Sequence, residues 1–94
     1  MRLIIRQKAA DDLDAIYEWI AKDSAVSARR VVLALLARIE SVLLPELANI
    51  GRPGQRNGTR ELVEWPYIIV YTVDGGRETI TIVSVVHGAR NREE

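Results

Sequence analysis

Hydrophobic residues recur at helical spacing through the first half of the chain. Between residues 8 and 22 they fall three or four positions apart, which predicts an amphipathic helix. The pattern breaks at Asp23-Ser24 and resumes in a second predicted helix that ends before Pro45, and Ser24 or Ser27 can cap its first turn. A short link between two amphipathic helices predicts an antiparallel helical hairpin. The apolar positions are Ala10, Leu13, Ile16, Tyr17 and Ile20 in the first helix, and Ala28, Val31, Val32, Leu35, Leu36, Ile39, Val42 and Leu43 in the second.

The second half of the chain changes to the alternation typical of strands. Residues 51–58 are rich in glycine and predict a loop. Residues 60–63, 67–73 and 78–86 then predict three strands, and Asp74-Gly75-Gly76 predicts a tight hairpin turn because Asp-Gly supplies positive backbone angles. Residues 3–5 predict a short first strand. That strand reaches the sheet by way of the hairpin, so we expect it to pair with a strand far along the chain.

The predicted order of elements is β-αα-βββ, an α+β fold. In such a fold the helical hairpin packs on a small, mainly antiparallel sheet. Chains divide into several cores only at two or three times this length, so residues 1–94 are expected to form one domain. Hydrophobic residues make up 48% of the chain, which is enough for a single core.

Charge and composition narrow the classes of function. Thirteen Lys and Arg balance 13 Asp and Glu, which argues against extensive contact with nucleic acid, since proteins that bind many phosphates usually carry a basic excess. The absence of cysteine excludes disulfides, thiolate metal sites and a thiol nucleophile, and we expect no metal and no cofactor. The N-terminus does not resemble a signal peptide, and no apolar run approaches the roughly 20 residues that cross a bilayer. We therefore expect a cytoplasmic protein without membrane contact.

Several segments, in the same order along almost the whole chain, resemble the RelE/ParE toxin superfamily, nearer its ParE branch. The first helix is similar to the opening helix of that family, and residues 51–63 resemble a stretch common in ParE-type members. Residues 66–71 are similar to the central strand and residues 85–90 to the closing one. The motifs read Ala10-x-x-Leu13-x-x-Ile16-Tyr17, Gly51-Arg52-Pro53-Gly54, Gly58-Thr59-Arg60-Glu61-Leu62-Val63, Pro66-Tyr67-Ile68-Ile69-Val70-Tyr71 and Val85-Val86-His87-Gly88-Ala89-Arg90.

This resemblance implies the toxin of a bacterial type II toxin–antitoxin system, of the kind associated with growth inhibition and plasmid stabilisation. ParE-type members bind DNA gyrase without chemistry of their own, whereas RelE-type members are ribosome-dependent endoribonucleases that cut messenger RNA. Both are held inactive by an antitoxin. Here the resemblance implies a ParD-like antitoxin in a hetero-oligomer, with DNA contacted mainly through the antitoxin. A third possibility is a non-toxic binding module of a repressor complex.

A RelE-like nuclease would use Arg60, His87 and Arg90 in this chain. Cleavage by a 2′-hydroxyl needs a base, an acid and cationic stabilisation of the phosphate. The central strand departs from that class because it reads Tyr67-Ile68-Ile69-Val70-Tyr71, with an isoleucine where the nucleases commonly carry an arginine. We therefore favour the non-enzymatic, gyrase-binding interpretation, in which His87 is a strand-end residue bonded to backbone.

A binding toxin needs surface residues that contact its target or its antitoxin. Each candidate also has a simpler interpretation: a soluble turn for the loop arginines, a cross-strand ion pair for Arg60, a solvated tail for the last two arginines, and ordinary packing for the tyrosines, with their hydroxyls at the edge. We expect Tyr17 and Trp19 in the core or the hairpin interface and Trp65 packed in the same ordinary way, with an antitoxin groove as the alternative for exposed aromatic residues. The candidates are Arg52, Arg56, Arg60, Tyr67, Tyr71, His87, Arg90 and Arg92.

Overall fold

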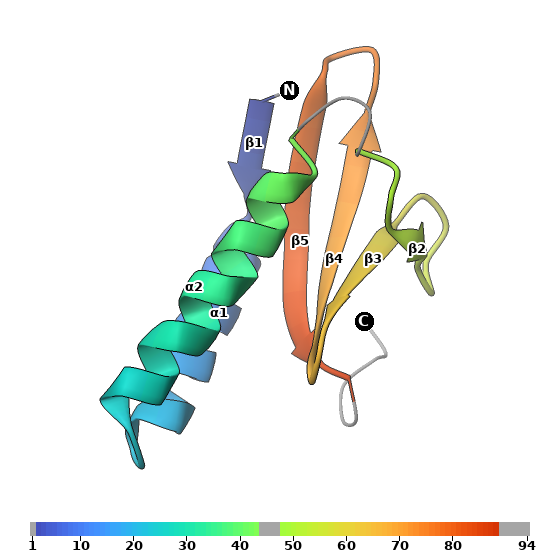
Figure 1. Cartoon of the computed structure of the whole chain (residues 1–94). Helices are drawn as coiled ribbons and strands as arrows, with labels where there is room; N and C mark the ends of the chain where they lie inside the picture. The colour runs from blue at the N-terminus through green and yellow to red at the C-terminus, as the bar shows by residue number, and fades with distance from the viewer. Residues whose placement is uncertain (1, 44–47, 89–94) are drawn as a thin grey trace.

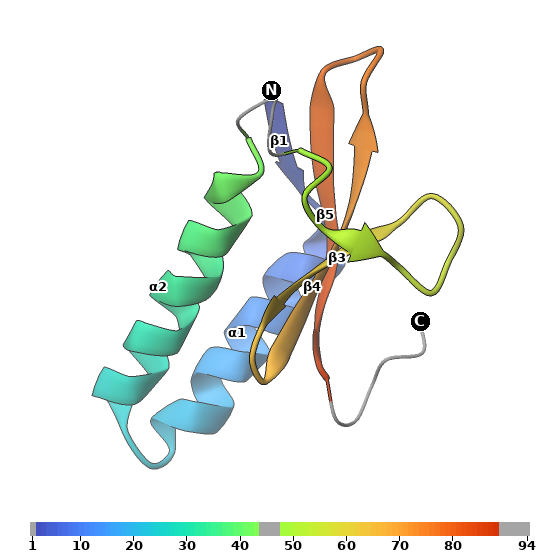
Figure 2. The same cartoon turned by 45° about the vertical axis from the view of Figure 1, so that its right-hand side comes forward.

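The computed structural model of the chain describes residues 2–43 and 48–88. Its two helices lie side by side as a hairpin against one face of a sheet (Figures 1 and 2). The predicted α+β architecture is therefore confirmed, and the described residues hold one short strand more than the sequence pattern predicted. In chain order the elements are β1 (Arg2–Ile5), α1 (Gln7–Ala21), α2 (Ala25–Ser41), β2 (Arg52–Pro53), β3 (Arg60–Glu64), β4 (Tyr67–Asp74) and β5 (Thr79–His87).

The sheet is mixed, with its strands in the order β1-β5-β4-β3-β2. β1 runs parallel to β5, from Arg2 opposite Thr79 to Ile5 opposite Ile82, and every other pair is antiparallel. A parallel pair needs a crossover connection, and the chain between β1 and β5 includes the helical hairpin. The prediction that the first strand pairs far along the chain is confirmed.

β2 lies inside the segment that was predicted to be a loop. Its two residues, Arg52 and Pro53, pair with Glu61 and Arg60 of β3. Two residues are too few to show the alternation that identifies a strand, so the pattern of the sequence could not predict β2.

Local sequence explains where the second helix starts. The Ser24 hydroxyl accepts a hydrogen bond from the Ser27 backbone N–H at 3.1 Å, and Ser24 is thus the N-cap of α2. Such a bond satisfies one of the N–H groups that a helix leaves without a partner in its first turn. Of the two serines predicted to cap this helix, Ser24 is the one that does so.

The main hydrophobic core lies between the hairpin and the sheet. β4 is apolar on both faces: Ile69 and Tyr71 face the helices, whereas Ile68 and Val70 belong to a smaller cluster with Val86. A strand buried on both faces reads as a continuous apolar run, which is what the sequence of β4 shows. The largest fully buried hydrophobic side chains are Tyr71, Leu35, Ile39, Ile69, Ile80, Ile82 and Val42.

Three aromatic residues expected to pack inside lie at the surface instead. The exposed fraction is 40% for Tyr17, 62% for Trp19 and 75% for Trp65, so the prediction for these three residues was wrong. Leu13 is a buried residue of α1, and Trp19, six positions later, points to a different side of the helix. Trp65 occupies the two-residue turn between β3 and β4.

The turn between β4 and β5 is longer than the predicted Asp-Gly hairpin. Asp74 pairs with Thr79, which leaves residues 75–78 as the connection. The positive φ of 53° falls at Glu78 rather than at a glycine of this turn. The reason is the Asp74 side chain, whose Oδ1 accepts the Arg77 N–H at 3.2 Å and so favours a wider turn. The predicted tight turn was therefore wrong in its length and in the residue with positive φ.

Candidate functional site

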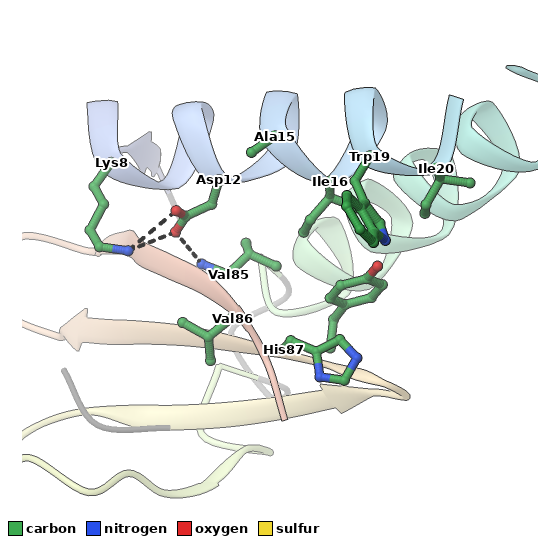
Figure 3. A pocket seen from close by; sticks show the side chains of 10 residues that line it. Lys8, Asp12, Ala15, Ile16, Trp19, Ile20, Val85, Val86 and His87 are labelled. Atoms are coloured by element: carbon green, nitrogen blue, oxygen red, sulfur yellow. Dashed lines mark hydrogen bonds and ion pairs between the residues drawn. The ribbon is translucent and has the colours of Figure 1, made fainter. Parts of the chain in front are cut away.

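A pocket of about 500 Å³ opens between α1 and the C-terminal end of β5 (Figure 3). α1 contributes one wall, since residues of its pocket-facing stripe recur three or four positions apart. Ile16 and Trp19 project from this wall toward β5, and Val85 and His87 lie opposite them. The lining residues are Lys8, Asp12, Ala15, Ile16, Trp19, Ile20, Tyr67, Val85, Val86 and His87.

Asp12 ties the helix to the strand at one end of this pocket. Its Oδ2 accepts the backbone N–H of Val85 at 2.9 Å and forms an ion pair with Lys8 Nζ, also at 2.9 Å (Figure 3). β1 pairs with β5 only as far as Ile82, so beyond that point the carboxylate of Asp12 stands where the carbonyl of a neighbouring strand would stand. Asp12 thus satisfies a backbone donor at an otherwise open sheet edge.

Aromatic side chains form the other end of the pocket. The rings of Tyr67 and His87 meet edge to face, with centroids 5.6 Å apart and planes at 82°. The two residues are opposite each other in the β4–β5 ladder, so strand register brings them together. Trp19 forms the outer wall, and the ammonium group of Lys22 lies 5.2 Å from the centroid of its ring, within the range of a cation–π contact.

Other predicted residues gather around the segment that precedes β2. Arg60 Nη1 donates to the carbonyl oxygens of Gly51 at 2.7 Å and of Asn49 at 3.2 Å. The Tyr71 hydroxyl donates to the Ala48 carbonyl and accepts from the Gly51 N–H, both at 3.0 Å. Arg60 and Tyr71 therefore hold residues 48–51 against the sheet, a structural role that the sequence did not predict.

The ion pair in this region differs from the expected one. Arg52 Nε lies 3.0 Å from Oε1 of Glu61, a carboxylate that is only 4% exposed. Arg60 was expected to form a cross-strand ion pair in its simpler interpretation, but Arg60 bonds to carbonyl groups and Arg52 forms the pair. The hydroxyl of Tyr71 is likewise buried rather than at the edge, because it bridges two backbone groups.

The structure distributes the predicted site residues over two regions. Tyr67 and His87 line the pocket, whereas Arg52, Arg60 and Tyr71 lie around residues 48–54. Arg56 is exposed in the loop between β2 and β3. The tail residues Arg90 and Arg92 lie outside the described residues.

Sequence reasoning missed Lys8 and Asp12 as residues of a site, and it considered Trp19 as one only as the alternative to a packed position. One feature could have indicated Trp19: it falls outside the stripe of Leu13, Ile16 and Ile20 that marks the buried face of α1. No local pattern indicates Asp12, because its partner Val85 lies 73 positions along the chain.

Metal-binding groups and membrane-spanning helices were sought among the described residues. Within residues 2–43 and 48–88, no group of three or more His, Cys, Asp or Glu side chains is placed to hold a metal. In the same part of the chain, neither helix is long and apolar enough to cross a membrane.

A helical hairpin on one face of a five-stranded mixed sheet, reached in the order β-αα-ββββ, defines a small domain with the fold of the RelE/ParE toxins. The family model described as the ParE toxin of the type II toxin–antitoxin system parDE matches residues 3–92. The chain therefore belongs to the ParE toxin family. No curated protein sequence matches it closely enough to count as a relative.

Two solved structures support the same assignment of the fold. A chain of the chromosomal ParDE toxin–antitoxin system of P. aeruginosa is 28% identical, with a TM-score of 0.79, over 93% of this chain and 95% of that one. A chain of the RelBE2 toxin–antitoxin complex of Mycobacterium tuberculosis is 22% identical, with a TM-score of 0.68, over 92% of this chain and 88% of that one. At that identity the second likeness concerns the fold alone.

Proposed function

We propose that this chain inhibits growth by binding DNA gyrase in the cytoplasm, without catalysis, and that a ParD-like antitoxin neutralises it. The observation that carries the proposal is the match of a ParE toxin model to residues 3–92. Similarity over nearly the whole length to a chain from a ParDE system adds support.

The geometry gives independent support against the nuclease alternative. Arg60 pairs with Tyr71 and His87 with Tyr67, so four residues of β4 separate the two, about 14 Å at the rise of an antiparallel strand. Nuclease chemistry needs its acid, base and cation within hydrogen-bond reach of one phosphate. The guanidinium of Arg60 already bonds to two carbonyl groups. Between Tyr67 and Asp74 the sequence of β4 has no basic residue that could replace it.

The surface also suits an antitoxin that wraps the domain. A pocket beside α1 can take apolar side chains, and β5 beyond Ile82 has no strand neighbour on the side of β1 within the described residues. Antitoxin segments could therefore bind as a helix in a groove and a strand on an edge, two general modes of peptide recognition.

The mode of toxicity is tested by inducing the chain in bacterial cells. Gyrase binding should elongate the cells and switch on the DNA-damage response while messenger RNA stays intact. Purified toxin should also inhibit supercoiling by gyrase in vitro. Rapid loss of translation, with cuts inside ribosome-bound messages, would instead favour the RelE-like activity.

Substitution of His87 separates binding from catalysis. In a nuclease His87→Ala should remove a factor of roughly 10²–10⁴ in rate, because general acid–base catalysis contributes about that much. In a binding toxin the same change removes one contact of many, and growth on induction should recover only slightly. Deletion of residues 90–94, or Arg90→Ala alone, should weaken toxicity more than His87→Ala does. Complete loss of toxicity in His87→Ala, with a silent tail deletion, would contradict the proposal.

Pairing with an antitoxin is tested by expression with and without the adjacent reading frame. Alone, the toxin should be poorly tolerated or poorly soluble, and co-expression should rescue both growth and yield. Equal and harmless yields in the two cases would refute an antitoxin partner encoded there.

A further inference from the structure

We propose that two copies of this chain associate through the outward face of α2, with the two helices antiparallel. The inference goes beyond the proposed function and depends neither on gyrase nor on an antitoxin. Three features of α2 carry it: an exposed stripe at the spacing of a helix–helix seam, an order of residues along the stripe that complements itself in reverse, and charges that have no ion-pair partner among the described residues.

The stripe is the first feature. Ala28, Leu35 and Ile39 are the buried residues of α2, and the stripe lies on the opposite side of the helix, at the outside of the domain (Figure 2). Val26 is 70% exposed and Leu33 is 56% exposed. Five exposed residues follow one another here at alternating intervals of four and three positions, the spacing of a seam that packs against another helix. The stripe consists of Val26, Arg30, Leu33, Ala37 and Glu40.

The order of residues along the stripe is the second feature. When two copies of α2 run antiparallel with the twofold axis level with Leu35, Arg30 of one copy lies opposite Glu40 of the second copy. At the same register Leu33 lies opposite Ala37, so a large side chain meets a small one. Each contact then occurs twice, as in any interface that a twofold axis relates to itself. Opposite charges and complementary sizes therefore meet at one and the same register.

The unpaired charges of α2 are the third feature. Glu40 lies in the last turn of the helix, where the helix dipole disfavours an acid, so local stability does not explain its place. Within residues 2–43 and 48–88, neither Arg30 nor Glu40 forms an ion pair. A second copy would supply each of these exposed charges with the opposite one. This charge complementarity makes a second copy the occupant that the stripe fits.

The size of the stripe sets the strength of the dimer. α2 has 17 residues, so it is about 25 Å long at a rise of 1.5 Å per residue. A stable interface buries about 800 Å² of each partner, and one face of a single helix offers less, so the dissociation constant should be on the order of 10–100 µM. The residues that line the pocket beside α1 belong to α1, β4 and β5, and pairing through α2 therefore leaves that pocket open.

Sedimentation equilibrium of the purified full chain tests the inference, because it reads the mass of the particle at each concentration. Arg30→Glu would place like charges opposite each other twice in the dimer, and we expect it to weaken dimerisation by about tenfold. Glu40→Arg should weaken it to a similar extent for the same reason. The double variant, Arg30→Glu with Glu40→Arg, restores both opposite pairs and should dimerise like the wild type.

The matched control is Arg77→Glu, which makes the same change of charge in the exposed turn between β4 and β5 and should dimerise like the wild type. Recovery in the double variant is the decisive result, since a second charge reversal would not repair a misfolded single variant. Far-UV circular dichroism of each variant adds an independent measure of folding.

Four results would overturn the inference. They are a wild-type chain that is monomeric up to about 1 mM, single variants that dimerise like Arg77→Glu, a double variant that dimerises as weakly as the single ones, and single variants that lose binding to the product of the adjacent reading frame but keep self-association. In the last case the antitoxin, and not a second copy, occupies the stripe. The first three leave the proposed function as it stands, because gyrase inhibition and antitoxin binding are measured separately.

Discussion

The hydroxyl of Tyr71 joins the centre of β4 to a segment that lies 20 to 23 positions earlier in the chain. It donates to the Ala48 carbonyl and accepts from the Gly51 N–H, and the side chain is fully buried. Tyr71→Phe keeps the ring but removes both bonds, and it leaves the amide of the buried Gly51 without this acceptor. A net hydrogen bond contributes about 0.5–1.5 kcal/mol, and an unpaired buried group costs about 1–3 kcal/mol. We expect the free energy of unfolding to fall by about 2–3 kcal/mol.

The assay is urea unfolding followed by far-UV circular dichroism. Tryptophan fluorescence would be a weak probe, because both tryptophans are already more than half exposed. With a slope of about 1–3 kcal/mol per molar urea, the midpoint should fall by about 0.7–3 M without a change in slope. Tyr67→Phe is the matched control: it removes the same atom from a ring that lies at the edge of the pocket. Equal midpoints for the two variants would refute the reasoning.

A loss of toxicity in Arg60→Ala could come from a lost contact with a partner or from loosening of residues 48–51. Comparison with Tyr71→Phe separates these two causes. Arg60 bonds to the carbonyl of Gly51, so Arg60→Ala should loosen the same segment as Tyr71→Phe does. Residues that share a partner usually show a coupling energy of about 0.5–3 kcal/mol in a double-mutant cycle. If Arg60→Ala reduces toxicity and Tyr71→Phe does not, Arg60 contacts the target or the antitoxin directly. If Arg60→Ala and Tyr71→Phe reduce toxicity equally, the position of residues 48–51 is what toxicity requires, and not the charge of Arg60.

Three further predictions concern stability and are read from the same urea midpoints. Gly51→Ala would place a Cβ 2.7 Å from the Glu61 carbonyl and from the Tyr71 hydroxyl, so it should lower the free energy of unfolding by about 1–3 kcal/mol. In the control Gly75→Ala the added Cβ meets no atom within 4 Å, and stability should hardly change. Similar midpoints for the two variants would show that the close approach at Gly51 is not real. Asp12→Ala should cost about 1–3 kcal/mol, since it leaves the Val85 N–H without its charged acceptor, and the exposed Asp11→Ala should stay within about 0.5 kcal/mol. Ser24→Ala should cost about 1 kcal/mol by removing the N-cap of α2, and no loss would mean that the cap contributes nothing.

The sequence by itself determined the elements whose cause is local. Helical spacing predicted both helices, because an amphipathic stripe needs only neighbouring turns to be recognised. Ser24 was among the predicted caps for the same reason, since its partner lies three positions away. The order β-αα-βββ and the continuous apolar run of β4 then led to the α+β fold, and the resemblance of the motifs led to the family that the comparison shows.

Tertiary structure alone decided which residues meet at the pocket. Tyr67 and His87 are neighbours because of the register between β4 and β5, and Asp12 reaches Val85 because the pairing of β1 with β5 ends at Ile82. Neither fact has a local pattern, since strand register depends on side chains far apart in the chain. For the same reason the sequence could not decide the exposure of Trp19, which was expected in the core or the hairpin interface and is 62% exposed. A residue beside the apolar stripe of a helix is buried or exposed according to how far the sheet extends beneath it, and only the packed fold fixes that extent.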